Sequence, residues 1–431
     1  MGLQNISIAD GVRLHCLPTG KFKTNFMSVS FTAPLEAGVN AMNSLIPNIL
    51  LRGSEKYPDM AAINKRLDYL YAAGISTRCS KRGDVQVFGL CADMLDSSYA
   101  IGGEDLVAEM TDMLGELLLH PIKVGEGFDP DYTESEKNNQ IDAIRASINN
   151  KVYYAYRRCV EEMCRGERFG LTETGTVDET SACTPESLYS QYKYALKHYP
   201  IEIFFVGQCD ADALADRLRS IFSFEREPIA LPATEVIRSA AEPRIVTEDM
   251  PVNQGKLVIG MRSGLTLADP EYPALMLCNA IYGGAVTSKL FMNVREKLSL
   301  CYYCQSSPDA SKGLLMIQSG IEVSNREVAE KAILEQLEAV RRGDFTDEEM
   351  NGALLFLINS YNELADSARG LENWYLGRMI FNIPGEPDEM VEKLRAVTRE
   401  DIIAAAKLPT LDTVYFLNGT LCGEDEEDEN A

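Results

Sequence analysis

The chain has 431 residues, of which 45% are hydrophobic and 25% charged, and its net charge is −24. This length predicts two or three domains, and the composition is that of a globular protein. The acidic balance argues against nucleic acid and against an anionic membrane surface as partners, because phosphate groups are bound by clusters of Lys and Arg. It is typical of a well-solvated surface, and it would also attract basic peptides.

We expect no targeting or membrane segment. Met1–Gly20 lacks a basic start followed by a long apolar run, and no stretch approaches the ~20 apolar residues of a membrane span. The 11 cysteines are scattered and odd in number, which favours reduced thiols in a cytoplasmic protein. Cys301-Tyr-Tyr-Cys304 is the only C-x-x-C, and in a strand-like run buried thiols are a simpler interpretation than a redox or metal pair.

Strand-like and helix-like segments alternate along the first half of the chain. Apolar, β-branched runs predict strands, and apolar residues at helical spacing predict helices. The predicted strands are 26–31, 83–89 and 201–207, and the predicted helices are 41–51, 104–120 and one that follows the capping residue Thr184.

The second half repeats this order. A shift of about 230 residues places 26–31 on 256–261, 41–51 on 271–281 and 83–89 on 313–319. A shift of about 212 places the Thr184 helix and its strand on a helix after Thr398 and the strand 413–419. Further helices are predicted at 326–342 and after the capping box Thr346–Glu349. We infer an internal duplication.

The predicted fold is α+β, with two duplicated domains that each pack helices on a mostly antiparallel sheet. The predicted domains are 1–222 and 244–421, joined by a linker at 223–243 that contains Pro228, Pro232 and Pro243. The acidic tail at 422–431 is a block of like charge, typical of a solvated segment.

Residues for self-sufficient hydrolysis are scarce. The only histidines are His15, His120 and His198, in separate segments and without a second His three or four residues away. A catalytic zinc site usually includes His, and a Ser or Cys triad needs His as its base. There is no G-x-S-x-G elbow, and Gly283-Gly284 lacks the Lys-Ser/Thr of a phosphate-binding loop.

The chain nevertheless resembles the pitrilysin/insulinase metallopeptidases of the mitochondrial-processing-peptidase type over about residues 1–420. In that family an inverted H-x-x-E-H zinc motif ends a few residues before a Lys/Arg-Gly-Thr turn. Arg52-Gly53-Ser54 is similar to this turn. The resemblance therefore places Ser44 and Asn48 at the two histidine positions and Pro47 at the catalytic glutamate.

The third zinc ligand of that family is a glutamate seven residues after another acidic residue. Glu136 resembles the first acid, which places Ala143 at the ligand position, with Asp142 beside it. The resemblance thus implies a degenerate zinc site at Ser44, Pro47, Asn48 and Ala143, without a bound metal or other cofactor.

The second half keeps a different family feature. Gly283-Gly284 and the following segment to Tyr302 are similar to the family's glycine-rich loop and its Arg…Tyr pair. The resemblance implies that Gly283, Gly284, Arg295 and Tyr302 bind substrate, with Tyr303 as the neighbouring alternative to Tyr302. Guanidinium and phenol groups donate hydrogen bonds to a peptide carbonyl or to the oxyanion formed from it. The structural alternative is a local ion pair for Arg295 and a core position for the tyrosine.

The resemblance implies a non-catalytic, peptide-binding subunit of a heterodimeric zinc metallopeptidase, with zinc only in the partner. The alternative is a stand-alone peptide-binding or scaffolding homodimer without proteolysis. A third reading is an enzyme of unrelated mechanism that uses a thiol such as Cys79 or Cys91.

Overall fold

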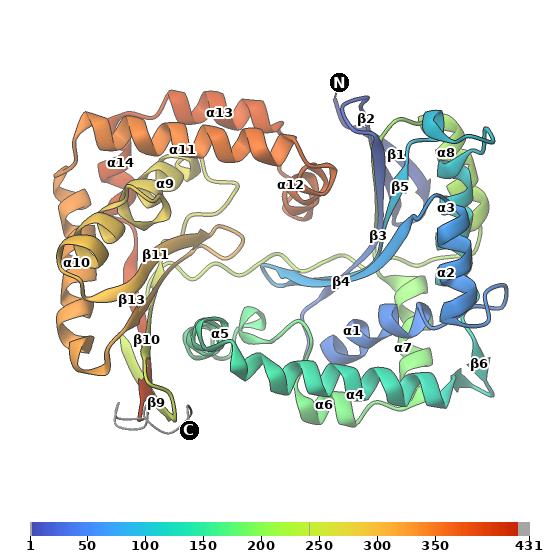
Figure 1. Ribbon diagram of the computed structural model, residues 1–431, viewed down its shortest axis with the longest axis horizontal. Coiled ribbons are helices and arrows are strands. Elements are labelled where there is room, and N and C mark those ends of the chain that lie inside the picture. Colours follow the sequence, from blue (N-terminus) through green and yellow to red (C-terminus); the bar gives the residue numbers. More distant parts are fainter. Residues whose placement is uncertain (1, 241, 421–431) are drawn as a thin grey trace, which may run out of the picture. The chain divides into compact units, whose positions relative to one another are not determined.

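The computed structural model describes residues 2–240 and 242–420, which form two compact units (Figure 1). The first unit contains the described residues up to Ala146 together with Leu171–Ala233 and Ala365–Ile380. The second contains Ser147–Gly170, the described residues of Thr234–Leu364 and those from Phe381 onwards. Each unit thus takes most of its residues from one half of the chain and one segment from the other half. The predicted acidic tail lies outside the described residues.

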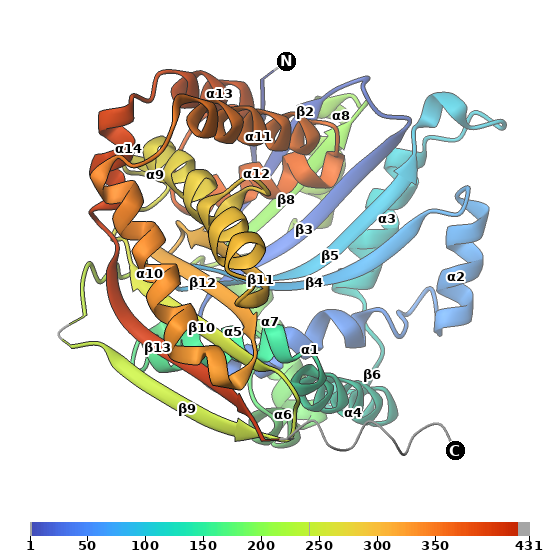
Figure 2. The ribbon, with the colours of Figure 1, turned by 60° about the vertical axis from the view of Figure 1, so that its left-hand side comes forward.

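The first unit is built on a six-stranded sheet with the strand order β1-β2-β8-β3-β5-β4. Neighbouring strands are antiparallel except β2 and β8. Figure 2 shows β3, β5 and β4 as three long neighbouring strands, which pair in antiparallel fashion. The strands are β1 (Gln4–Ala9), β2 (Val12–Pro18), β3 (Thr24–Pro34), β4 (Gly74–Arg82), β5 (Val85–Leu95) and β8 (Ile201–Gly207), with a separate hairpin of β6 (Lys123–Val124) and β7 (Gly127–Phe128).

Helices cover both faces of this sheet. The helices are α1 (Val39–Leu50), α2 (Met60–Tyr69), α3 (Leu106–Leu119), α4 (Pro130–Ala146), α6 (Val177–Ser181), α7 (Pro185–His198), α8 (Ala211–Ile221) and α12 (Ala368–Ile380). Because side chains alternate along a strand, Met27 and Val29 of β3 enter the main apolar core with α1 and α3. Ser28 and Ser30 point to the opposite face, where Ser28 donates to Glu372 of α12 and Ser30 accepts from Arg78 of β4.

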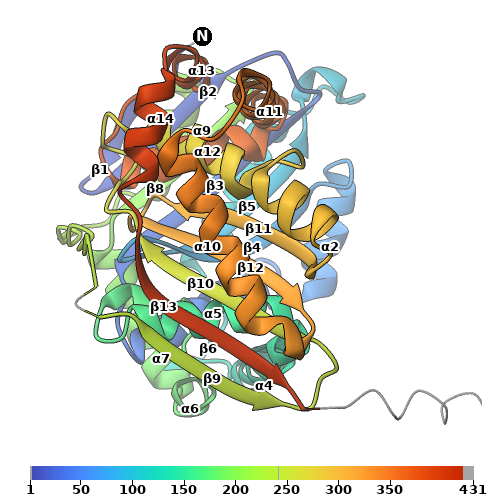
Figure 3. The same cartoon turned by 90° about the vertical axis from the view of Figure 1, so that its left-hand side faces the viewer.

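The second unit is built on a five-stranded sheet with the strand order β11-β12-β10-β13-β9. All neighbours are antiparallel except β13 and β9, which Figure 3 shows side by side. The strands are β9 (Arg244–Met250), β10 (Gly255–Arg262), β11 (Cys301–Asp309), β12 (Leu314–Ile321) and β13 (Thr410–Gly419). The helices are α5 (Lys151–Met163), α9 (Tyr272–Asn279), α10 (Arg326–Arg342), α11 (Asp347–Ala365), α13 (Pro387–Arg395) and α14 (Arg399–Ala406).

The two sheets share one topology, which confirms the predicted α+β fold and duplication. The order β2-β8-β3-β5-β4 corresponds to β9-β13-β10-β12-β11, and the single parallel pair occupies the same place in both sheets. The segments 26–31 and 256–261 lie within the corresponding strands β3 and β10. The additional strand β1 extends only the first sheet.

In each unit, a buried carboxylate binds the segment that comes from the other half of the chain, Ala365–Ile380 in the first unit and Ser147–Gly170 in the second. In the first unit, Glu372 of α12 is 0% exposed and accepts hydrogen bonds from both terminal nitrogens of Arg78 and from Ser28. In the second unit, Glu167 follows α5 and pairs with Arg262 at 2.7 Å and with Lys312 at 3.0 Å. Since buried charges are tolerated only when paired and hydrogen-bonded, these contacts fix where the two segments pack.

The predicted linker contains no helix or strand among its described residues. It is held to the first unit by Arg226, a buried residue whose guanidinium donates to the carbonyls of Asp10, Leu196 and Tyr199. The predicted boundaries 1–222, 223–243 and 244–421 separate the two sequence repeats, whereas the compact units exchange segments between them. These boundaries stay a prediction.

Local signals in the sequence locate several helices. Helix α10 spans the predicted Arg326–Arg342, and α3 lies within 104–120. The capping box at Thr346 is present, with reciprocal bonds of 3.1 and 2.7 Å to Glu349. Among the helices of residues 2–240 and 242–420, none combines the length and apolar character needed to cross a membrane.

Candidate functional site

Helix α1 carries the three positions that the resemblance assigns to the zinc motif. Ser44 is buried, Asn48 is partly buried, and Pro47 lies inside the helix. Pro47 has no N–H to donate to the preceding turn, and it offers no group for proton transfer. The side-chain amide of Asn48 donates to the carbonyl oxygen of Ser44 at 3.2 Å, so it bonds within its own helix.

The Ser44 hydroxyl points at helix α4. It donates to Oε1 of Gln140 at 3.0 Å, and Gln140 is itself only 8% exposed. Nε2 of Gln140 donates to the carbonyl of Thr174 at 3.0 Å and lies 3.1 Å from the Thr180 hydroxyl. All these groups are neutral, and each finds a partner, as buried polar groups must.

A second amide pair continues this network. Nδ2 of Asn43 donates to Oε1 of Gln86 at 2.9 Å, and both side chains are 0% exposed. Gln191 of α7 donates to Oδ1 of Asn43 at 2.9 Å, while Gln86 donates to the carbonyl of Asn40 at 3.0 Å. We call Asn43, Ser44, Gln86 and Gln140 the amide network. Its uncharged hydrogen bonds join α1 to α4 through Ser44 and Gln140 and to β5 through Asn43 and Gln86, and Gln191 links α7 to Asn43.

The predicted third ligand position lies on the exposed side of α4. Ala143 is exposed, whereas Gln140, one turn earlier on α4, is the residue that bonds to Ser44. The buried residues of α4 are Thr133 and Gln140, which lie about two helical turns apart. The assignment of Ala143 to the third ligand position stays a prediction. Asp142 is likewise exposed and does not replace the missing ligand.

The residues at this position do not fit a zinc ion. Zinc takes thiolate, imidazole and carboxylate ligands, and Ser44, Asn48 and Gln140 supply none of them. Each of these three side chains is already engaged in a hydrogen bond, with another side chain or with a backbone carbonyl. Within residues 2–240 and 242–420, no three His, Cys, Asp or Glu side chains gather where they could hold a metal ion.

The Arg-Gly-Ser turn after α1 is structural. The Arg52 guanidinium pairs with Glu136 and donates to the Ser135 hydroxyl at 2.9 Å, which ties the end of α1 to α4. At Gly53, an added Cβ would lie 2.7 Å from Ile122 and 2.9 Å from the carbonyl oxygen of Pro58. The turn therefore keeps α1 and α4 adjacent without contributing a reactive group.

The thiols proposed for an unrelated mechanism are protonated near neutral pH. Burial raises the pKa of Cys79 to about 12, against the opposing effect of its hydrogen bonds to Ser44 and Gln86. Burial also raises the pKa of Cys91. Because the thiolate is the nucleophile, neither residue fits a catalytic cysteine.

Arg295 and Tyr302 both reach solvent in the second unit. Arg295 lies in the π-helix Leu290–Lys297, and its side chain is 38% exposed. Its guanidinium stacks over Phe291, 4.5 Å from the ring centre, and lies 3.6 Å from Glu296. Tyr302 is 54% exposed at the start of β11, with its hydroxyl 3.4 Å from Glu322. Tyr303 instead packs on Gly320, and burial raises the pKa of its phenol, so Tyr302 is the accessible tyrosine.

The two glycines before this turn serve close packing. An added Cβ at Gly283 would lie 2.5 Å from Leu290 and 2.9 Å from the backbone nitrogen of Ser306. At Gly284 it would lie 2.6 Å from the side chain of Asn279. Gly283 therefore lets the helix end lie against β11, the strand that carries Tyr302, and Gly284 makes room for Asn279 at the end of α9. Their predicted contact with substrate stays a prediction.

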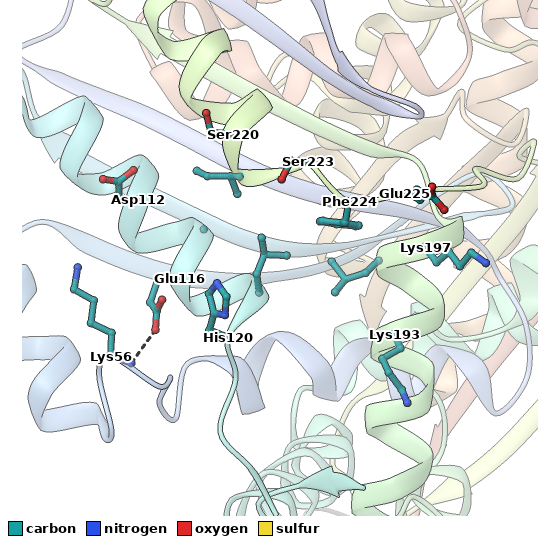
Figure 4. Close-up of a pocket in the computed structure, with 14 residues that line it drawn as sticks. Lys56, Asp112, Glu116, His120, Lys193, Lys197, Ser220, Ser223, Phe224 and Glu225 are labelled. Atoms are coloured by element: carbon teal, nitrogen blue, oxygen red, sulfur yellow. Dashed lines mark hydrogen bonds between the residues drawn. The ribbon is translucent and has the colours of Figure 1, made fainter.

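The three histidines remain apart. His15 is buried and bonds to Glu202 at 2.8 Å, and His198 bonds to the carbonyl of Glu227 at 2.9 Å. His120 lines a cavity of about 750 Å³ at the ends of α3, α7 and α8 (Figure 4). The lining residues are Lys56, Asp112, Gly115, Glu116, Leu119, His120, Lys193, Leu196, Lys197, Ser220, Ile221, Ser223, Phe224 and Glu225.

This cavity does not hold a hydrolytic triad. The Ser220 hydroxyl donates to the carbonyl of Asp216, and Glu116 accepts from Ser54 and from the backbone of Lys56. Neither residue bonds to the imidazole of His120 in the described part of the chain. None of the positions assigned to the degenerate zinc site lines the cavity.

Sequence reasoning missed the amide network. Its signal was present in the otherwise apolar helix, where Asn40, Asn43 and Ser44 recur at helical spacing on the side that becomes buried. Their partners Gln86 and Gln140 lie on distant segments, and nothing in the sequence marks them as neighbours of this helix.

Comparisons with known proteins agree with these observations. A family model described as "Peptidase M16 inactive domain" matches residues 182–355. A Bacillus subtilis protein named "Probable inactive metalloprotease YmfF" is 32% identical over 410 residues, which cover 95% of this chain and 96% of that protein. The crystal structure of a conserved protein from Enterococcus faecalis is 28% identical, with a TM-score of 0.90 over 97% of this chain and 98% of that one.

A more distant structure shares the fold. The crystal structure of a peptidase M16 inactive domain from Pseudomonas fluorescens is 18% identical, with a TM-score of 0.80 over 98% of this chain and 99% of that one. The predicted family and the predicted lack of independent catalysis are confirmed. The chain belongs to the peptidase M16 family, the pitrilysin/insulinase-type zinc metallopeptidases, as a non-catalytic member.

Proposed function

We propose that this chain is the substrate-binding, non-catalytic subunit of a heterodimeric zinc metallopeptidase that acts on peptides. In this proposal it contributes Arg295 and Tyr302 to the active site of a zinc-bearing homologous partner. The observation that carries the proposal is a contrast between the two halves. The zinc position of the first half is filled by bonded neutral side chains, whereas two strong donors of the second half remain accessible.

The chemistry of the two donors supports this role. A guanidinium and a phenol stabilise the negative charge that develops on a peptide carbonyl when a metal-bound water attacks it. Arg295 remains available to bind a carbonyl oxygen, because its ion pair with Glu296 is long and solvent-exposed. Such exposed pairs contribute at most about 1 kcal/mol. Zinc would belong to the partner chain, since the residues of this chain do not fit it.

Two edge strands support the binding of an extended peptide. β4 ends the six-stranded sheet and β11 ends the five-stranded sheet, so each pairs with one neighbour only among the described strands. An edge strand offers free backbone N–H and C=O groups to an added strand. Tyr302 lies on β11 itself, where a peptide bound along this edge would meet its hydroxyl group.

The test is reconstitution with a homologous chain that carries an intact H-x-x-E-H motif. Each chain alone and an equimolar mixture are assayed on a quenched fluorescent peptide library, and zinc is measured in each sample. We expect hydrolysis in the mixture, zinc in the partner only, and a loss of about 10²-fold in kcat for Tyr302→Phe. Tyr99→Phe is the matched control, because Tyr99 is 50% exposed in the first unit.

The alternative function makes a different forecast. A stand-alone peptide-binding homodimer would bind peptides alone, show no hydrolysis in any mixture and sediment as a dimer of identical chains. Failure of the mixture to hydrolyse any peptide, together with a stable homodimer, would contradict the heterodimer proposal.

A further inference from the structure

A bulge at the start of β11 places two cysteines on the same face. Cys301 pairs with Ile321, Tyr303 with Gly320 and Cys304 with Ser319, so the four residues 301–304 of β11 lie opposite the three residues 319–321 of β12. Residues two apart on a strand share a face, and Ile321 and Ser319 are two apart. Without the bulge, Cys301 and Cys304 would point to opposite faces of the sheet.

The bulge also brings the two cysteines within reach of each other. Two strand positions span about 6.6 Å, which lies at the upper end of the Cα separations that a disulfide bridges. The two side chains are close enough for each thiol to shift the pKa of the other. Both cysteines are in the free thiol form.

The two thiols differ in a way that suits stepwise oxidation. Cys301 is partly exposed and Cys304 is 4% exposed. The hydrogen bond from Cys304 lowers the pKa of Cys301, with further help from Ser319 and from the charge of Arg295. The same hydrogen bond and burial raise the pKa of Cys304. The accessible sulfur is therefore the one that ionises first, and its protonated neighbour lies behind it.

Another thiol pair provides the contrast. The sulfurs of Cys16 and Cys209 lie 3.5 Å apart, within hydrogen-bond distance. There the hydrogen bond from Cys209 lowers the pKa of Cys16, but Cys16 is 0% exposed, and the pKa of the partly exposed Cys209 is raised. The ionisable sulfur of this pair is hidden, so short distance alone does not make it reactive.

We propose that Cys301 and Cys304 form a dithiol site that reacts with hydroperoxides and closes to an intramolecular disulfide. The Cys301 thiolate attacks one peroxide oxygen, the O–O bond breaks, and the departing oxygen takes a proton and leaves as water or an alcohol. Cys301 is then a sulfenic acid. The Cys304 sulfur, losing its proton, attacks the Cys301 sulfur, an S–S bond forms, and the hydroxyl leaves as water.

The electrons balance in this sequence. Two thiols lose two electrons and two protons, and one hydroperoxide gains them. A small dithiol reductant reverses the change. Tyr302 is the bulged residue between the two cysteines, so the disulfide also reshapes the backbone that carries this exposed phenol. The dithiol chemistry itself does not depend on the proposed partner subunit.

The test uses the reduced full-length protein and limiting hydrogen peroxide at neutral pH. Samples are taken over time, free thiols are alkylated, and peptides are analysed by mass spectrometry without reduction. We expect the Cys301–Cys304 disulfide to appear at least tenfold faster than the loss of the Cys79 or Cys209 thiol. In Cys304→Ser, dimedone should trap a sulfenic acid at Cys301.

Two further variants complete the design. Cys301→Ser should abolish the disulfide, and Cys209→Ser should leave its rate unchanged. Circular dichroism checks that each variant is folded, and Cys301→Ala repeats the test with a second side chain. The proposal is overturned if Cys301 reacts no faster than Cys209, or if Cys304→Ser yields no dimedone adduct.

Discussion

The amide network predicts a large penalty for a single isosteric change, Gln140→Glu. The substitution keeps the size of the side chain and replaces its N–H groups with a carboxylate oxygen. That oxygen would face the carbonyl of Thr174, which lies 3.0 Å from Nε2 of Gln140. A variant with no cavity and no steric conflict thus tests the polar interactions of this position and not its packing.

The magnitude follows from what is lost. The carbonyl of Thr174 loses its donor from Gln140, and an unsatisfied buried polar group costs about 1–3 kcal/mol. The new charge is also buried, because Gln140 is 8% exposed, and it has no cationic partner in the network. We expect the free energy of unfolding of the first unit to fall by about 3 kcal/mol at neutral pH.

The assay uses the only tryptophan of the chain. Trp374 lies on α12 in the first unit, so its fluorescence during urea unfolding reports that unit. Hydrogen exchange of α1 and α4 provides a second, local measurement. The control is Gln4→Glu, which makes the same charge change at an exposed position on β1 and should shift stability by less than about 0.5 kcal/mol.

The pH dependence of this variant has a definite sign. Burial raises the pKa of an introduced carboxyl above its unfolded value of about 4.3. Its contribution to stability is then retained below that unfolded value and lost as the pH rises through the folded pKa. The penalty should therefore grow from pH 4 to pH 8. Equal stability of Gln140→Glu and wild type at neutral pH would refute the hydrogen-bonded network.

Two further predictions concern the exchanged segments. Glu372→Gln removes the fully buried carboxylate that pairs with Arg78, so α12 should detach more readily. We expect the free energy of unfolding to fall by about 3 kcal/mol and proteolysis near 365–380 to become faster. Glu363→Gln, at an exposed position, is the control, and equal protection of the two variants would contradict this. In the second unit, burial alone would raise the pKa of Glu167. The hydrogen bonds from Arg262 and Lys312 outweigh this effect, so the pKa of Glu167 is lowered. A lowered pKa gives stability that is present above the unfolded value of about 4.3 and lost as the pH falls through the folded pKa. In Glu167→Gln, the stability measured by circular dichroism should therefore fall less steeply at acid pH than in the wild type. An unchanged decrease at acid pH would refute this prediction.

The sequence predicted the fold well because its signals are local. Capping boxes at Thr346 and Thr398 and the apolar spacing of Arg326–Arg342 depend on residues within one or two turns. The duplication was visible because corresponding strands kept their spacing. The exchanged segments were not visible, because Glu372 meets Arg78 across almost three hundred residues and no local pattern links them.

The candidate site was predictable only in part. The loss of ligand chemistry at Ser44 and Asn48 follows from residue type, and the structure shows both side chains bonded to neutral groups. The assignment of the third position to Ala143 stays a prediction. Because α4 is mostly polar, its apolar spacing does not identify the buried face, and the contact of Gln140 with Ser44 could not be predicted. The accessibility of Tyr302 relative to Tyr303 depends on a bulge that no sequence pattern announced.

The central proposal is that this chain supplies donors to another chain's metal centre, and kcat of the reconstituted mixture tests it most directly. Arg295→Ala is compared with Arg326→Ala, since both guanidiniums stack over a phenylalanine in the second unit, at 4.5 and 4.9 Å from the ring centres. The proposal predicts that Arg295→Ala lowers kcat by about 10²–10³-fold and that Arg326→Ala leaves it unchanged. An active mixture whose kcat is the same with Arg295→Ala and with wild type would contradict it.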